Sequence, residues 1–267
     1  MSWFAEQSVV LQAFLAGLFT WTCTIIGSGI VFFFKNVSRK LLDTMQGFAA
    51  GVMIAASFWS LLAPSISYAE PIYGSWSWVP AAVGFLLGGY FLRFIDAIIP
   101  HLHLGHDIAK AEGGSKEERK KLSKTALLFL AITIHNIPEG LAVGVTFGAL
   151  ANNFSQAAYV GALGLALGIG LQNIPEGSAL SIPIRTDGKT RQQAFFWGAM
   201  SAIVEPIAAV IGAVAVIYMT PILPYALSFA AGAMMFVVVE ELIPESQTNG
   251  NTDRATLGLM MGFVIMM

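Results

Sequence analysis

The sequence predicts an all-α, polytopic membrane protein with eight transmembrane helices, forming one transmembrane domain over residues 1–267. Three observations lead to this prediction. Hydrophobic residues make up 56% of the chain and charged residues only 11%, whereas a soluble domain carries about 25% charged residues. The apolar residues form segments close to the ~20 residues that a membrane-spanning helix needs. Nearly all basic residues lie between alternate segments, as is typical of membrane proteins.

The eight predicted spans follow one another along the whole chain. Their approximate bounds are 8–34, 42–68, 76–100, 124–149, 157–182, 193–217, 222–244 and 255–267. The first is expected to be a retained span and not a cleaved signal, because no basic region precedes it. A helix over the last segment rises only about 20 Å, against a hydrocarbon core of about 30 Å. The chain as given is therefore expected to end within its final helix.

The basic residues predict the orientation. Thirteen of the 14 Lys and Arg residues lie in 35–41, 101–124, 183–192 and 245–254, and the other is Arg93, inside the third span. The segments on the opposite side contain no Lys or Arg. The positive-inside rule therefore places these four segments in the cytoplasm and both termini outside. A compact chain without a long outside domain is expected in a bacterial inner (plasma) membrane.

A hexapeptide occurs almost identically in two neighbouring spans. The sequence HNIPEG at residues 135–140 matches QNIPEG at residues 172–177 in five of six positions. Ionisable groups at membrane depth are costly and usually line a pathway or a site. Inverted repeats are typical of transporters, which bind their substrate where the repeats meet. The alternative is a pair of ordinary proline-kinked helices, but a kink does not require Glu139 and Glu176.

The side chains of the two motifs suit a divalent metal ion. His135 and Glu139 share a helical face, and Gln172 and Glu176 repeat the same spacing. Carboxylates without a cation in a low dielectric would be expected to take up protons, and a divalent ion could compensate them instead. One imidazole with several carboxylate and amide oxygens suits zinc, iron or manganese better than sodium, calcium or magnesium. The alternative for His135 is a hydrogen-bonded core histidine.

Other polar residues in the spans extend this candidate site. They are Asn136, Asn173, Glu205, Glu240 and Glu241. Asn136 and Asn173 each follow the first residue of their motif, about 100° around the helix. Glycines at 140, 144 and 148 in the fourth span, and at 161, 164, 168 and 170 in the fifth, are expected to serve close helix packing.

At these motifs the chain resembles the ZIP (Zrt/Irt-like) family of divalent-metal transporters. The resemblance covers nearly the whole chain, and HNIPEG is a highly specific part of it. QNIPEG, Glu205-Pro206 and the sequence ELIPE at residues 241–245 add to it. The resemblance implies a 3+2+3 bundle: two three-helix units related by inverted pseudosymmetry, with helices four and five between them. Helices two, four, five and seven would surround the metal.

The resemblance also implies a binuclear metal site. The first ion would be bound by His135, Glu139, Gln172 and Glu176. The second would be bound by Asn136, Asn173 and Glu205, with Glu139 and Glu176 shared, and Glu241 would be a further ligand along the pathway. Some relatives carry Asp in place of Asn173, so the second site is expected to be weaker here. Relatives often carry His in place of Glu240, so the preference for zinc over harder ions is expected to be weaker.

Five more residues are candidate metal ligands that also have a simple structural alternative. They are Met53, Asp96, His101, His103 and His106. Met53 lines the pathway or belongs to the core. The pattern Asp-x4-His-x-His starts at the cytoplasmic end of the third span and continues into the segment 101–123, which is expected to be a flexible cytoplasmic loop. This cluster is either an exit or storage site for metal or part of a solvated loop.

Together these observations predict a carrier that imports divalent transition-metal ions into the cytoplasm by alternating access, with one or two ions bound. Zinc is the expected ion, with cadmium, iron or manganese as further candidates. The expected partners are the metal ion and the lipid bilayer; the net charge of −2 gives no sign of a nucleic-acid partner, and a homodimer is compatible with the sequence. Two other classes are an intramembrane metalloenzyme and a non-transporting metal sensor. The metalloenzyme is disfavoured because no His-Glu-x-x-His motif occurs, and a sensor needs fewer spans.

Overall fold

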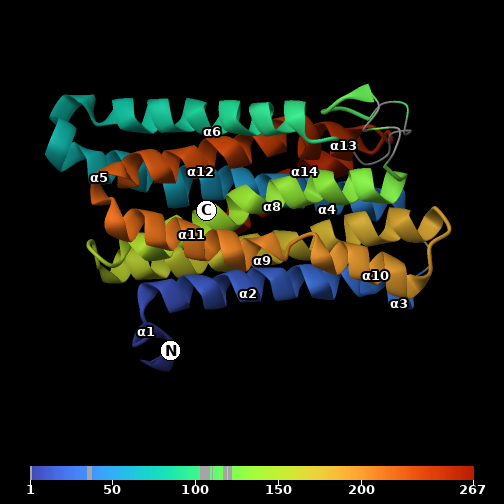
Figure 1. Cartoon of the computed structure of the whole chain (residues 1–267), viewed down its shortest axis with the longest axis horizontal. Helices are drawn as coiled ribbons and strands as arrows, with labels where there is room; N and C mark the ends of the chain where they lie inside the picture. The colour runs from blue at the N-terminus through green and yellow to red at the C-terminus, as the bar shows by residue number, and fades with distance from the viewer. Residues whose placement is uncertain (1, 35–37, 103–108, 110, 117–118, 120–121) are drawn as a thin grey trace.

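The computed structural model is a bundle of long helices that run roughly side by side (Figure 1). It describes all residues except 1, 35–37, 103–108, 110, 117–118 and 120–121. Within these described residues, seven helical stretches are long and apolar enough to cross a membrane. The only β-type pairing in the same residues is an isolated bridge between His101 and Glu112. The prediction of an all-α, polytopic membrane protein is confirmed.

The first four spans contain the following helices. A short helix α1 (Ser2–Ala5) precedes the first span, which combines α2 (Val9–Ser28) and α3 (Ile30–Phe33). The second span runs through α4 (Arg39–Ala55), the π-helical segment η1 (Ala56–Leu62) and α5 (Ala63–Tyr73). The 3-10 turn η2 (Gly74–Trp76) leads to the third span, α6 (Trp78–Ile98), and the fourth is α8 (Lys124–Ala149).

The second half of the chain continues in the same way. The fifth span is α9 (Gln156–Thr186), and the sixth combines α10 (Arg191–Met200) and α11 (Val204–Tyr218). After the turn η4 (Thr220–Ile222), the seventh span combines α12 (Leu223–Val237), the π-helical η5 (Val238–Leu242) and α13 (Ile243–Gln247). The last helix, α14 (Thr252–Met266), has 15 residues. It rises about 22 Å, so the eighth predicted helix is present but short.

Hydroxyl side chains begin five of these helices. Each accepts a hydrogen bond from the backbone N–H three residues on, and they are Ser8, Ser38, Ser123, Ser155 and Thr190. Such N-caps satisfy donors that have no partner within the helix. The caps therefore help to fix where α2, α4, α8, α9 and α10 start.

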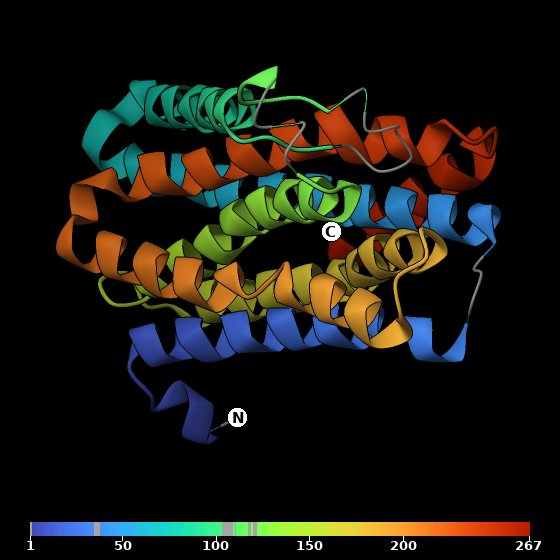
Figure 2. The same ribbon diagram turned by 45° about the vertical axis from the view of Figure 1, so that its right-hand side comes forward.

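The helices pack in pairs that repeat between the two halves of the chain. Helix α2 packs against α9, and α11 packs against α8. Helix α4 packs against α14, and α12 packs against α6. Figure 1 shows α2 and α10–α11 running in opposite directions, and both the second and the seventh span contain a π-helical segment. This is the pairing expected of two three-helix units of inverted topology, with α8 in the middle of the bundle in both views (Figures 1 and 2).

Glycines allow all four of these pairs to approach closely. A Cβ at Gly144 would lie 2.1 Å from the carbonyl oxygen of Ala209 on α11, and one at Gly51 would lie 1.9 Å from that of Leu259 on α14. The packing role predicted for Gly140, Gly144 and Gly148 is confirmed. The same prediction is wrong for Gly161 and Gly164, because no atom lies within 4 Å of a Cβ built at either position. These two glycines border open space on α9.

The two ends of the bundle differ in charge. The last turns of α3, α6, α9 and α13 and the first turns of α4, α8, α10 and α14 lie at the end seen on the right of Figure 1. Among the described residues, Arg39, Lys124, Lys189 and Arg254 of the four predicted basic segments lie at or next to these helix ends. We call this end of the bundle the basic end. Here Lys124 at the start of α8 forms an exposed ion pair of 3.0 Å with Asp187 after α9.

Candidate metal centre

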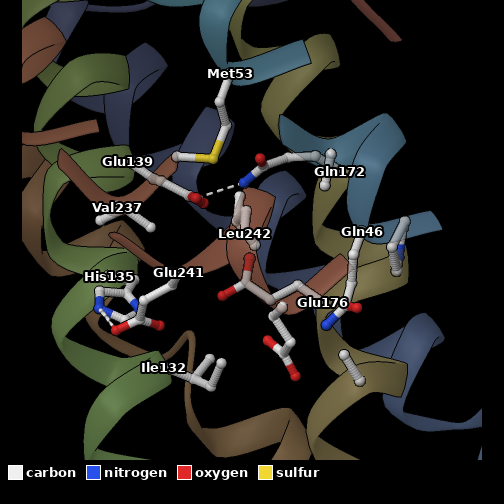
Figure 3. Close-up of a pocket in the computed structure, with 14 residues that line it drawn as sticks. Gln46, Met53, Ile132, His135, Glu139, Gln172, Glu176, Val237, Glu241 and Leu242 are labelled. Carbon is white, nitrogen blue, oxygen red and sulfur yellow. Dashed lines mark hydrogen bonds and ion pairs between the residues drawn. The ribbon is translucent and has the colours of Figure 1, made fainter. Parts of the chain in front are cut away.

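A small cavity lies in the middle of the bundle between α4, α8, α9 and the η5–α13 segment. Its volume is about 30 Å³, roughly the share of one water molecule in the liquid. The predicted ligands that line it are His135, Glu139, Gln172, Glu176 and Glu241, together with Met53 (Figure 3). Among the residues that the structure describes, no Lys or Arg lines the cavity. An ion of the size of a divalent metal therefore has room next to several carboxylates without a competing cation.

The side chains of the cavity are bonded to one another. Gln172 donates a hydrogen bond from Nε2 to Oε1 of Glu139 (Figure 3). His135 Nε2 lies 3.0 Å from Oε1 of Glu241 on η5. Glu176 is half-buried and interacts electrostatically with His135 and Glu241. The two hexapeptides thus face each other across the cavity, as their repeat predicts.

A second cluster of predicted ligands lies outside the cavity. Asn173 donates from Nδ2 to Oε1 of Glu205 at 2.8 Å and to the backbone oxygen of Thr20 at 3.1 Å. Asn136 is fully buried, and neither of its amide atoms has a hydrogen-bond partner among the described residues. We call Asn136, Asn173 and Glu205 the closed cluster, and His135, Glu139, Gln172, Glu176 and Glu241 the cavity cluster.

The local sequence explains the positions of both clusters. Residues four apart face the cavity, while each asparagine is rotated about 100° toward α2 and α11. Helices α8 and α9 continue through Pro138 and Pro175. At the sixth span, residues 201–203 form a turn between α10 and α11, which places Glu205 in the first turn of α11. Gly140 lets this turn approach α8, since a Cβ there would lie 2.5 Å from the carbonyl oxygen of Glu205.

The ligands are not pre-assembled around one point. In the part of the chain that the structure describes, no three His, Cys, Asp or Glu side chains are grouped closely enough to hold a metal ion. Glutamine and asparagine amides separate the carboxylates, and Glu139 and His135 each have a side-chain partner. A metal ion bound here would have to replace these internal contacts with metal–ligand bonds.

The remaining candidates lie in different surroundings. Glu240 is exposed and does not line the cavity. Asp96 and His101 are buried near the basic end, and His101 Nδ1 lies 2.9 Å from the backbone oxygen of Ile99. His103 and His106 lie outside the described residues. The segment after α6 is not wholly solvated, because Leu102 is fully buried against α8.

Two polar residues of the cavity wall were not candidate ligands in the sequence. Gln46 on α4 and Glu245 on α13 line the cavity with the predicted residues. Glu245 belongs to the ELIPE sequence, which contained a signal for it. A single glutamine in an apolar segment has no motif around it, so the sequence offered no signal for Gln46.

The fold and the cavity define a class of protein. Polytopic helical bundles with ionisable side chains at membrane depth are typically transporters or channels. A sequence model of the family described as ZIP zinc transporter matches residues 101–267. The chain belongs to the ZIP family, and it is a transporter and not an enzyme.

Relatives match the chain over nearly its whole length. The chain is 40% identical to the zinc transporter ZIP11 of Homo sapiens, over 98% of this chain and 97% of that protein. It is 38% identical to the zinc transporter GufA of Myxococcus xanthus, over 94% of each chain. It is 34% identical to the zinc transporter ZIPB of Bordetella bronchiseptica, over 96% of this chain and 79% of that protein.

Proposed function

We propose that the protein carries divalent transition-metal ions, zinc first, across the membrane by alternating access. The observation that carries the proposal is the cavity cluster, in which His135 and Glu139 of α8 face Gln172 and Glu176 of α9. One imidazole, two carboxylates and an amide oxygen form a donor set suited to zinc, and also to cadmium, iron or manganese. The relatives named as zinc transporters support zinc as the cargo.

Binding proceeds by exchange of contacts within the cavity cluster. The Gln172 amide turns its oxygen toward the ion and releases Glu139, while His135 releases Glu241. Because Glu139 interacts electrostatically with Glu176 and Glu205, an ion here lowers the repulsion among three carboxylates inside the bundle. Protons compete for the same ligands, so uptake is expected to weaken at acid pH.

The surroundings of the cavity support a direction of transport through the bundle. On the side of the cavity away from the basic end, the bundle is filled by buried apolar side chains. They include Met53, Val143, Ile169 and Met234. Toward the basic end, the cavity extends to Gln46 and Glu245. We propose that the basic end faces the cytoplasm of a bacterial inner membrane, with both termini outside. The structure then corresponds to a state that is closed to the outside.

The closed cluster is proposed to hold a second ion. Asn136 and Glu205 are completely buried and keep polar atoms that have no hydrogen-bond partner in the described structure. Polar atoms of this kind are costly unless a ligand satisfies them. Asn173 is neutral, so this ion would depend on Glu205 and on Glu139 and Glu176, which it shares. Asp96 and His101 are proposed as later contacts for the departing ion near the basic end.

The proposal is tested by zinc uptake into proteoliposomes that contain a zinc-sensitive dye. His135→Ala and Glu176→Ala are expected to lose uptake, because each removes a ligand of the cavity cluster. Asp253→Asn, at an exposed position on α14, is the matched control and should transport like the parent protein. Undiminished uptake by both alanine variants would refute the assignment of the site.

A further inference from the structure

The cavity is lined by several parts of the bundle. Helices α8 and α9, whose hexapeptides face each other, carry four ligands of the cavity cluster. Helix α4 and the η5–α13 segment complete the lining. On α4, the residues that face the cavity are Gln46, Ala49 and Met53, which share one side of the helix. Gln46 is the only one of the three with a hydrogen-bonding side chain.

Gln46 is a buried polar residue whose side chain lines the cavity. Its exposed fraction is 7%, and among the described residues its amide is not buried in a hydrogen bond to a neighbour but borders the cavity space. Figure 3 places Gln46 across the cavity from His135, toward the Glu176 end and away from the Glu139–Gln172 pair. A polar amide inside a membrane protein is stabilised when it has a polar partner. Because Gln46 borders the cavity, a ligand in the cavity is within its reach.

The backbone that carries Gln46 is firmly fixed. Gly47 and Gly51 bring α4 into close contact with α14. Asp43, one turn before Gln46 and completely buried, accepts hydrogen bonds from Asn249 Nδ2 at 3.1 Å and Asn251 Nδ2 at 2.7 Å. Gln46 therefore stands on a firmly packed helix, across the cavity from His135.

We infer that Gln46 is a metal ligand on the release side of the site, binding a divalent transition-metal ion through its amide oxygen Oε1 as the ion moves from Glu176 toward the basic end. Met53 lies two turns, or about 10 Å, farther from the basic end on the same face of α4. A neutral amide oxygen replaces water around the ion without adding a charge that would trap it. The inference rests on the proposed function and extends it to a residue outside the two hexapeptides.

The test compares two variants of similar size, Gln46→Glu and Gln46→Met. Metal binding is measured with zinc and cadmium by calorimetry on the purified full-length protein, and zinc uptake is measured in proteoliposomes. Gln46→Glu is expected to bind metal about tenfold more tightly and to transport it more slowly, because a carboxylate retains the ion. Gln46→Met is expected to lower maximal uptake about tenfold, because it removes the oxygen.

The control is Thr44→Ala, on the same helix but outside the cavity, where the hydroxyl donates to the backbone oxygen of Lys40. It should leave binding and uptake unchanged. Thermal unfolding of each variant identifies any loss of the fold. Parental affinity in a folded Gln46→Glu protein, or parental uptake by Gln46→Met, would overturn the inference. If the parent protein binds metal but does not transport it, the proposed function fails, while the tighter binding of Gln46→Glu still tests the ligand.

Discussion

The cavity cluster and the closed cluster are built from the same two hexapeptides but differ in their surroundings. The first and fifth residues of each hexapeptide face the cavity. They are His135 and Glu139 on α8, and Gln172 and Glu176 on α9. The asparagines that follow, Asn136 and Asn173, face α2 and α11, where Asn173 is bonded to Glu205 and to the backbone of Thr20. One helical turn therefore presents ligands to two different environments.

This difference shows that depth of burial and access to a cavity are separate properties of the two clusters. The closed cluster is the more deeply buried of the two, since Asn136, Asn173 and Glu205 are all fully buried. The cavity cluster has space for an ion and contacts between side chains that can be exchanged. We therefore expect substitutions in the cavity cluster to affect transport first, and substitutions in the closed cluster to affect stability first.

The largest effect is expected for Glu139→Ala. This carboxylate lies at the deep end of the cavity and is the acceptor of the Gln172 amide. Even residues that only support metal ligands typically change affinity or activity by about 10–100-fold, so loss of this ligand should lower zinc uptake by about 100-fold or more. Proteoliposome uptake checks the prediction. Glu139→Gln keeps the shape and should lose uptake as well; parental uptake by either variant contradicts the role of Glu139.

The next effect concerns the closed cluster and should appear in stability. Asn173→Ala removes the amide that donates to Glu205 at 2.8 Å, which leaves the buried carboxylate without that donor. The free energy of unfolding is expected to fall by about 1–3 kcal/mol. This loss is detected as a lower unfolding temperature in detergent. Thr22→Ala, at an exposed position on α2, is the control. A protein that unfolds like the parent but no longer transports would show that the closed cluster works as a site in its own right.

The sequence predicted the eight helices well, because each needs a long apolar segment and the charges between segments are asymmetric. It placed the second span at 42–68, whereas the helical path runs from Arg39 through Tyr73. The π-helical segments η1 and η5 were not predictable, since an apolar pattern carries no information on a single extra residue per turn. These segments decide which side chains of the second and seventh spans turn inward.

The site was predictable where two local patterns repeat and not where one residue stands alone. The i, i+4 spacing of His135 and Glu139, and its repeat at Gln172 and Glu176, indicated the shared cavity. Pairing between His135 and Glu241 depends on the packing of α8 against the seventh span, which the sequence does not encode locally. Gln46 could not be predicted, because a single glutamine in an apolar segment is recognised as a candidate ligand only once the structure shows that it lines the same cavity as the hexapeptides.

A smaller effect, on selectivity, is expected at the one position where the hexapeptides differ. Gln172→His gives α9 the imidazole that α8 already has at His135. Because nitrogen ligands favour zinc over manganese, the ratio of zinc to manganese uptake should rise by about tenfold. Competition between the two ions in proteoliposomes measures this ratio. Gln172→Glu adds an oxygen and a charge, and should shift the ratio toward manganese; an unchanged ratio in both variants would place Gln172 outside the ion's coordination shell.

The smallest effect is expected for Glu240→Ala, next to Glu241 in the π-helical segment η5. Glu241 is buried and lies 3.0 Å from His135, whereas Glu240 is exposed and turned away from the cavity. Exposed substitutions usually change free energies by no more than about 0.5 kcal/mol, so uptake should stay within about twofold of the parent protein. Glu241→Ala is the matched comparison and should reduce uptake strongly. If both variants lose uptake equally, η5 must rotate during transport and bring each glutamate in turn to the ion.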